Sequence, residues 1–368
     1  MDLDKSTLGI TASTPAAAPI AGAGKTVRAV AADGVVSLRQ PGGQGVGSPV
    51  EKPVPHNPGV PLDLSRVAAQ QVNRSAVERR TATLGTRRSV KKQWQAAWLL
   101  RALSLIDLTT LNGDDTPERV RRLCAKARQP LRMDLQAALG LSEQRLQVGA
   151  VCVYHAYVSE AVEALEGSGI PVAAVSTGFP AGLSPFETRV REIEASVAAG
   201  ASEIDVVITR AHALRGDWQA LYDEVRAFKA ACGSAHLKVI LATGDLKTLR
   251  LVARASWVAM MAGADFIKTS TGKEPVNATL PVALTMVRAI RDYAAQTGFQ
   301  VGFKPAGGVS SAKVALLYMM MMREELGPPW LEASHFRFGA STLLADIERQ
   351  LEHYLTGAYA NVDHMPKG

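Results

Sequence analysis

Between about residues 94 and 355 the chain alternates between short apolar runs and longer amphipathic stretches. The apolar runs are rich in β-branched residues and are LSLIDLTT (103–110), VGAVCVY (148–154), PVAAVST (171–177), EIDVVIT (203–209), LKVILAT (237–243), DFIKTS (265–270), VGFKP (301–305) and HFRFGA (335–340). Stretches such as PFETRVREIEASVAAG separate them and carry apolar residues at helical spacing. Eight strands with helical crossovers predict an α/β fold, a (β/α)8 TIM barrel. The GxGxxG fingerprint of an open Rossmann sheet is missing after the first run.

The alternation of side chains within these runs predicts which residues face the barrel interior. In EIDVVI three aliphatic side chains share one face and Asp205 lies on the other. In the same way, Lys268 in DFIKTS and Lys304 in VGFKP lie on the face of the strand opposite to that of their apolar neighbours. Both lysines are near the C-terminal ends of their strands, where barrel active sites lie. We therefore expect these three side chains to point into the barrel near its C-terminal end.

Two inward lysines beside a carboxylate favour Schiff-base chemistry. Burial and a neighbouring cation both lower the pKa of an amine, and a neutral amine can attack a carbonyl. A single strand lysine is more often part of a structural ion pair, and we interpret Lys238, at the start of its strand, in that way. Two lysines at the ends of consecutive strands, each followed by a small-residue turn, favour function instead.

Glycine-rich turns follow the last three predicted strands. They read STGK (270–273), AGGV (306–309) and FGAST (338–342). Such turns let backbone N–H groups approach an anion, and barrel phosphate sites form in this region. The three turns together predict a phosphate site beside the lysines.

The residues before the barrel differ in composition and charge. Residues 1–62 are rich in Ala, Gly, Pro and Ser, which predicts disorder, and residues 63–92 are polar and basic with some helix. Residues 1–92 hold 13 Lys/Arg and 6 Asp/Glu and so carry the whole net charge of +7. We predict a disordered extension over 1–90, a barrel over 91–358 that is complete without it, and a flexible tail over 359–368.

Other features narrow the class of protein. No apolar run approaches the roughly 20 residues of a membrane span, and Asp2 and Asp4 argue against a secretory signal. Three unpatterned cysteines favour reduced thiols and a cytoplasmic location. No CxxC or His-rich cluster occurs, so we expect neither a metal nor another cofactor.

Several motifs closely resemble the deoxyribose-phosphate aldolases over about residues 94–360. They are IDLTTLNGDDT, EIDVVI, LKVILATG, DFIKTSTGK, VNAT, VGFKPAGGV and FGASTLL. The resemblance implies a metal-independent class I aldolase on a TIM barrel. Such an enzyme interconverts 2-deoxy-D-ribose 5-phosphate with D-glyceraldehyde 3-phosphate and acetaldehyde, in deoxyribonucleoside catabolism.

The resemblance also implies roles for individual residues. Lys268 is the implied Schiff-base nucleophile, Lys304 the neighbouring cation that tunes it, and Asp205 the proton donor and acceptor. The implied contacts to the sugar hydroxyls are Asp107 and Thr109. The implied phosphate cradle consists of Gly272, Lys273, Gly307, Gly308, Gly339 and Ser341.

Four positions depart from the family pattern or need separate interpretation. Ser310 follows AGGV, where the family commonly has a basic residue, so one phosphate contact is expected to be missing. His155 replaces a usual proline and is interpreted as a loop residue. Cys152 is interpreted as a core thiol. Tyr359 lies in a tail that aligns loosely with family members whose tail tyrosine assists proton transfer.

Two other functions stay open at this point. One is a class I aldolase for a different sugar phosphate on the same barrel, against which the GFKPAGG lysine beside the FIKTSTGK lysine argues. The other is a binding protein whose basic extension engages nucleic acid. The extension lacks interleaved aromatic residues, so we expect a sugar-phosphate substrate and no nucleic acid partner. A homo-oligomer is compatible with the sequence.

Overall fold

Eight parallel strands form a barrel at the centre of the molecule. The computed structural model describes residues 10–12, 36–38 and 56–361. The barrel strands are β3 (Ile106–Thr109), β4 (Ala150–Tyr154), β5 (Val172–Ser176), β6 (Glu203–Val207), β7 (His236–Ile240), β8 (Phe266–Lys268), β9 (Gly302–Lys304) and β10 (Phe338–Ala340). Each is hydrogen-bonded to its neighbour in chain order, and β10 also pairs with β3. Isolated bridges Phe303–Phe336 and Ala306–Gly339 join β9 to the β10 segment and close the ring. The predicted (β/α)8 fold is confirmed.

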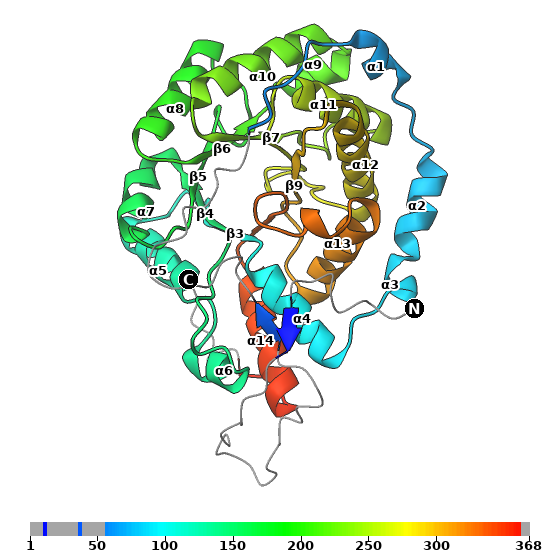
Figure 1. Cartoon of the computed structure of the whole chain (residues 1–368). Coiled ribbons are helices and arrows are strands. Elements are labelled where there is room, and N and C mark those ends of the chain that lie inside the picture. The colour runs from blue at the N-terminus through cyan, green and yellow to red at the C-terminus, as the bar shows by residue number, and fades with distance from the viewer. Residues whose placement is uncertain (1–9, 13–35, 39–55, 362–368) are drawn as a thin grey trace.

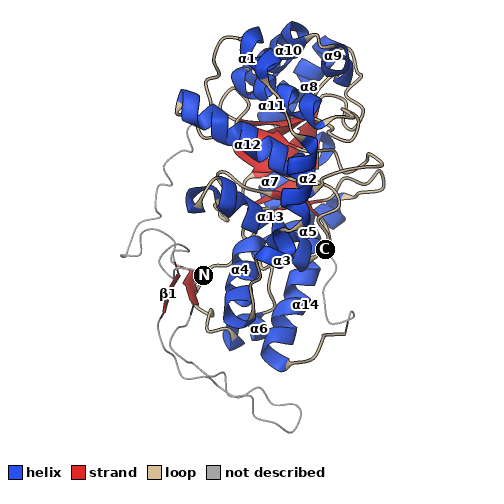
Figure 2. Ribbon diagram, turned by 90° about the vertical axis from the view of Figure 1, so that its right-hand side faces the viewer, coloured by secondary structure: helices blue, strands red, loops and turns tan. Residues whose placement is uncertain are grey.

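Helices surround the strands on the outside, as Figures 1 and 2 show. They are α4 (Lys92–Leu103), α5 (Pro117–Arg128), α6 (Met133–Ala138), α7 (Val158–Ala164), α8 (Phe186–Ala198), α9 (Arg210–Arg215), α10 (Trp218–Cys232), α11 (Leu249–Met261), α12 (Leu280–Thr297), α13 (Ala312–Glu325) and α14 (Leu343–Thr356), with 3-10 turns η2 (His155–Tyr157) and η3 (Pro328–Trp330). Hydroxyl side chains cap the N-termini of α11 and α12, where Thr248 and Thr279 accept from Leu251 N and Val282 N. Such a cap stabilises a helix by about 1 kcal/mol. None of the described helices is long and apolar enough to cross a bilayer.

The strands sort their side chains as the alternation predicts. Ile204, Val206 and Ile208 are fully buried in the large apolar core. Asp205, between them, is also fully buried but lies against charged partners inside the barrel. The burial of both faces explains why these runs look apolar almost throughout.

The described part of the N-terminal extension packs on the outside of the barrel. It forms α1 (Leu64–Ala69), α2 (Arg74–Ala82) and α3 (Leu84–Arg87), which run past α11, α12 and α13 (Figure 1). Val67, Val77 and Leu84 are buried there. The prediction of some helix over residues 63–92 is confirmed, whereas the prediction of a disordered extension is wrong for residues 56–90. Three short helices with few apolar residues each give a weak sequence signal, and their burial comes from docking on the barrel.

Asn57 anchors the start of this segment. Its backbone N–H donates to Asp265 Oδ1 at 2.8 Å, and its side-chain Nδ2 donates to the carbonyls of Met260 (2.8 Å) and Ala264 (3.0 Å). Tyr293 completes the cluster by donating from its hydroxyl to Asn57 Oδ1. These bonds tie the extension to the end of α11 and the loop before β8.

The two ends of the chain are described only in part. Strands β1 (Ile10–Ala12) and β2 (Val36–Leu38) pair antiparallel, which the prediction of a disordered segment did not anticipate. The rest of that prediction, over residues 1–9, 13–35 and 39–55, lies outside the described residues. In the predicted flexible tail, Tyr359 stacks on His353 of α14 with ring centroids 4.2 Å apart. Residues 362–368 of that tail also lie outside the description.

Candidate active site

Lys268, Lys304 and Asp205 meet inside the barrel. Asp205 Oδ2 accepts from Lys268 Nζ at 2.7 Å and from Lys304 Nζ at 2.8 Å. The two lysines are direct neighbours in the register of β8 and β9, each as the last residue of its strand. All three side chains are at most 3% exposed. The structure thus brings together the three residues that the sequence analysis grouped.

A wider charge network continues from this trio toward the start of the strands. Lys238 Nζ lies 2.8 Å from Asp205 Oδ1 and 2.6 Å from Glu203 Oε2. Arg337 then pairs with Glu203 at 2.9 Å. Asp107 closes the network, because its Oδ1 lies 2.6 Å from Arg337 Nη1 and its Oδ2 lies 2.5 Å from Lys304 Nζ.

The sequence analysis missed most of this extension of the site. Glu203 and Arg337 were not singled out, and Lys238 was interpreted only as a structural ion-pair member. Lys238 does form ion pairs, but with the same carboxylate that holds the two predicted catalytic lysines. The sequence did offer a signal for this contact, because Lys238 lies opposite Asp205 in the register of β7 and β6. Inward residues of neighbouring strands in a parallel barrel must meet.

The network holds one more cation than anions. Its four basic side chains are Lys238, Lys268, Lys304 and Arg337, and its three acidic side chains are Asp107, Glu203 and Asp205. Buried charges are tolerated when they are compensated, so one of the four cations is the natural group to lose its proton. Which of them does so decides the chemistry.

Lys268 is the member that gives up its proton most easily. Burial lowers its pKa and the charge of Lys304 lowers it further, against the opposing effect of Asp205. Burial also disfavours the charged form of Lys304, but Asp107 and Asp205 outweigh that effect and raise its pKa. Asp205 and Glu203 raise the pKa of Lys238 in the same way. Among the three lysines of this network, Lys268 alone has a lowered pKa.

Asp205 stays ionised between its partners. Burial alone would raise its pKa, but Lys238, Lys268 and Lys304 together hold it well below the usual range. A permanently charged carboxylate that touches three amines can accept hydrogen bonds from all of them and orient them. Its position fits proton exchange with Lys268 and Lys304 rather than storage of a proton at rest.

The glycine turns lie next to one another at the C-terminal end of the strands. Gly272, Gly307 and Gly308 all have positive φ, at 86°, 75° and 82°. A Cβ on Gly307 would come within 2.6 Å of the Asn277 side chain, and one on Gly339 within 3.2 Å of Lys304 Cε. The turn after β8 therefore backs directly onto the turn after β9, and β10 approaches the lysine closely. Lys273 and Ser341 are exposed beside these turns.

The remaining candidate residues have definite places. Asp107 is fully buried in the charge network, and Thr109 donates from its hydroxyl to the Asp107 carbonyl at 2.7 Å. Cys152 is fully buried in a small apolar cluster, and burial raises the pKa of its thiol. His155 lies in η2, where Nδ1 is 3.1 Å from Ser196 Oγ. Ser310 is exposed and precedes the N-cap of α13.

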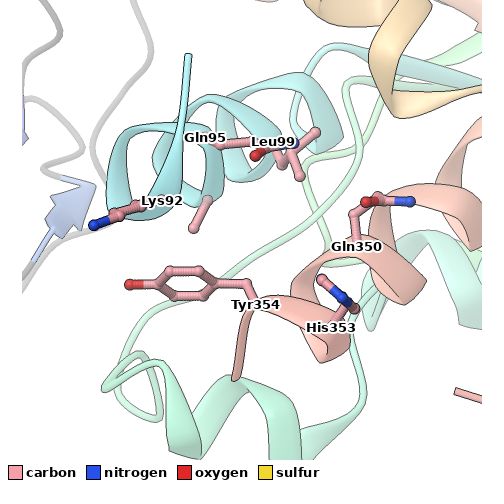
Figure 3. A pocket seen from close by; sticks show the side chains of 7 residues that line it. Lys92, Gln95, Leu99, Gln350, His353 and Tyr354 are labelled. Carbon is pink, nitrogen blue, oxygen red and sulfur yellow. The ribbon is translucent and has the colours of Figure 1, made fainter. Parts of the chain in front are cut away.

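Two surface cavities lie apart from the lysines. One of about 270 Å³ lies between α4 and α14 (Figure 3) and is lined by Lys92, Gln95, Ala96, Leu99, Gln350, His353 and Tyr354. The other, of about 560 Å³, lies between the extension at Val72 and Arg74, the loop after β7 and the start of α12. Neither wall contains Lys268, Lys304 or Asp205. Within the described residues no group of three or more His, Cys, Asp or Glu could hold a metal ion.

Comparison with known proteins relates this arrangement to one family. Residues 101–348 match the family model described as DeoC/LacD family aldolase. Proteins named deoxyribose-phosphate aldolase from Homo sapiens and Bos taurus are 57% and 56% identical over 313 residues, which cover 84% of this chain and 98% of each relative. A solved structure of a putative deoxyribose-phosphate aldolase from Toxoplasma gondii ME49 covers 75% of this chain and all of its own, with 23% identity and a TM-score of 0.61, and so supports the fold.

The length of the match with the human protein corrects one expectation. Residues 93–368 amount to only 276 positions, so a match of 313 residues includes part of the N-terminal extension. The expectation that the resemblance covers only about residues 94–360 is therefore wrong. This agrees with the packing of residues 56–90 on the barrel.

Proposed function

This chain belongs to the DeoC/LacD aldolase family, and on that premise we propose that it cleaves 2-deoxy-D-ribose 5-phosphate, reversibly, to D-glyceraldehyde 3-phosphate and acetaldehyde. The nucleophile is Lys268, which forms a Schiff base with the sugar. One observation carries this assignment: among the described carboxylates Lys268 pairs with Asp205 alone, whereas Lys304 pairs with Asp107 and Asp205 and Lys238 with Glu203 and Asp205, so Lys268 is the least compensated of the three lysines. The names of relatives at 56–57% identity support the substrate.

The bond changes follow from an amine inside the barrel. Neutral Lys268 attacks the C1 aldehyde of the open-chain sugar, and the carbinolamine takes up a proton on its hydroxyl and loses water to become an iminium ion. Removal of the C3 hydroxyl proton breaks the C2–C3 bond, and its electron pair moves into the iminium. D-Glyceraldehyde 3-phosphate leaves. The remaining enamine takes up a proton at C2, and water then releases acetaldehyde from Lys268.

Asp205 and Lys304 serve these proton transfers and the charge balance. Asp205 Oδ2 touches both amines, so it can exchange protons with Lys268 while the carbinolamine forms and collapses. Lys304 keeps its positive charge because Asp107 and Asp205 raise its pKa. That charge lowers the pKa of Lys268 and so favours the neutral amine that attacks. Asp107 and Thr109 contact the sugar hydroxyls in this proposal.

The glycine turns receive the 5-phosphate. Backbone N–H groups around Gly272, Gly307 and Gly308 face the anion, with Lys273 and Ser341 beside them. Gly339 donates its own N–H to the Pro305 carbonyl and contributes by the absence of a side chain next to Lys304. The positive φ values of the first three, and the Asn277 side chain 2.6 Å from a Cβ placed on Gly307, support a requirement for glycine there. Neither a metal nor an organic cofactor takes part in the proposed steps.

The protein's setting and its assembly belong to the same proposal. Three buried free cysteines support a cytoplasmic protein with reduced thiols. A homo-oligomer stays a prediction, which light scattering would check. The alternative of nucleic acid binding loses support because Arg80, Arg87 and Arg88 of the extension pair with Glu324.

Product analysis tests the substrate directly. The purified protein, given 2-deoxy-D-ribose 5-phosphate, should release acetaldehyde and D-glyceraldehyde 3-phosphate in equal amounts. Ketose phosphates offered in parallel should stay uncleaved. Turnover of a ketose phosphate without release of acetaldehyde from the deoxy sugar would favour the other class I aldolase activity instead.

A further inference from the structure

Arg210 joins four loops at the C-terminal end of the barrel. It is the first residue of α9, after β6, and its side chain is 18% exposed. Its guanidinium donates to the carbonyls of Pro180 (3.2 Å) and Ala181 (2.6 Å) in the loop after β5. Nε lies 2.8 Å from Asp245 Oδ2 in the loop after β7, and Nη2 lies 3.3 Å from Glu274 Oε1 in the loop after β8. No other function assigned above uses this residue.

Glu274 forms hydrogen bonds that fix the turn formed by the residues just before it. Its carboxylate accepts from the Thr271 backbone N–H at 3.0 Å and from the Thr271 hydroxyl at 2.7 Å. The same hydroxyl accepts from Lys273 N at 3.0 Å. Gly272 and Lys273 lie within the loop that these bonds close. The position of Glu274 therefore sets the direction of the N–H groups in the turn.

The negative charge of Glu274 would oppose phosphate binding here if no cation compensated it. Its side chain is only 5% exposed, and it lies one residue from Lys273 in the turn proposed to receive a phosphate dianion. A buried carboxylate without a cation is costly, and it would repel a second anion nearby. Arg210 neutralises this carboxylate and fixes its loop relative to three others.

We propose that Arg210 and Glu274 form a positioning pair that shapes the phosphate-binding turn for the substrate's 5-phosphate. The pair touches neither the sugar nor the phosphate, and it acts through Thr271 and the turn. This inference rests on the proposed function, which places the phosphate on the same turn. Within the described part of the chain, neither residue contacts Lys268, Lys304 or Asp205, so the Schiff-base step should be independent of the pair.

Arg210→Met tests the pair through a comparison of two sugars. The variant should raise KM for 2-deoxy-D-ribose 5-phosphate about 10-fold or more, since it leaves a buried carboxylate unpaired beside the phosphate. The value of kcat/KM for unphosphorylated 2-deoxyribose should change by less than about twofold. The double variant Arg210→Met, Glu274→Gln should recover part of the loss, because it removes the unpaired charge and keeps an amide oxygen that can accept from Thr271.

Arg145→Met is a matched control. Arg145 also binds two backbone carbonyls, of Gly167 (3.1 Å) and Ser168 (2.7 Å), but in the loop before β5 at the opposite end of the barrel. Arg145→Met should leave the ratio of kcat/KM for the two sugars unchanged. If Arg210→Met does not fold, Glu274→Gln provides a second test of the pair. It removes the negative charge of the pair and keeps the size of the side chain, and it should change the same ratio of kcat/KM for the two sugars.

The outcomes separate the pair from the proposed function. The positioning role would be overturned if the ratio of kcat/KM for the two sugars were unchanged in both Arg210→Met and Glu274→Gln. It would also be overturned if kcat/KM fell equally for both sugars. A wild-type protein without preference for the phosphorylated sugar would instead refute the phosphate site itself, before any variant is made. Loss of phosphate preference in the variants with intact acetaldehyde trapping on Lys268 is the expected result.

Discussion

Replacement of Lys304 by methionine tests how the site keeps Lys268 neutral. Both amines bind the same oxygen of Asp205, at 2.7 and 2.8 Å, so the two nitrogens are no more than about 5.5 Å apart. At an effective dielectric constant of about 20, two like charges at that distance repel by about 3 kcal/mol. This corresponds to about 2 pKa units. Removal of Lys304 also leaves Asp107 and Asp205 less compensated, which raises the pKa of Lys268 further.

The sign of the effect on rate follows from the form of Lys268 that reacts. The neutral amine attacks, so the rate of iminium formation rises as the pH rises through the pKa of Lys268. In Lys304→Met that rise should move upward by about 2 pH units, and the rate at a pH below both values should fall about 100-fold. At high pH the variant should recover most of its activity. The network titrates as a unit, so the comparison concerns the shift between two proteins.

The assay is the rate of iminium formation with acetaldehyde, trapped by cyanoborohydride, measured across pH in both proteins. Lys238→Met serves as the control, because Lys238 meets the other oxygen of Asp205 and should shift the profile less. Thermal melts check that each variant is folded. A profile for Lys304→Met that moves by less than about half a pH unit would refute the tuning role. Loss of activity at every pH would show that Lys304 is needed for chemistry rather than for tuning.

The other predictions concern the extension and the phosphate site. Removal of residues 1–54 should leave the melting temperature unchanged, whereas Asn57→Ala should lower the free energy of unfolding in urea by about 2–3 kcal/mol, because it removes three buried side-chain hydrogen bonds to the barrel. Equal stability of Asn57→Ala and wild type would contradict the anchoring role. Ser310→Arg should lower KM for the phosphorylated sugar selectively, by up to about 10-fold, as one added charge-assisted hydrogen bond would. Ser341→Asp should act in the opposite direction by repulsion, and steady-state kinetics with both sugars that show no selective change in either variant would place the phosphate elsewhere.

The sequence alone was enough to predict the barrel and the three residues at the centre of the candidate site. Seven of the eight predicted runs contain a strand and the eighth, 237–243, overlaps β7, because residues buried on both faces leave a continuous apolar signal. The inward direction of Asp205, Lys268 and Lys304 followed from the two-residue period of a strand. Those three side chains meet because their strands are consecutive, or nearly so, in the barrel.

Other parts of the structure depend on contacts that no local pattern reveals. The helices of residues 64–87 carry few apolar residues, and they are buried only because α11–α13 offer a surface to them. Glu203 of β6 and Arg337, which directly precedes β10, are far apart in the sequence and meet inside the barrel. Arg210 appears in the sequence as one more loop arginine, and its four contacts exist only once the loops are brought together.

The central claim is that Lys268 carries the Schiff base. Incubation with acetaldehyde and borohydride, followed by intact-mass and peptide mass spectrometry, tests it most directly. One ethyl group should appear per chain, on the peptide that contains Lys268, and Lys268→Leu should keep the fold and lose both the adduct and the activity. An adduct on Lys304 or Lys238, or substantial turnover by Lys268→Leu, would contradict the claim.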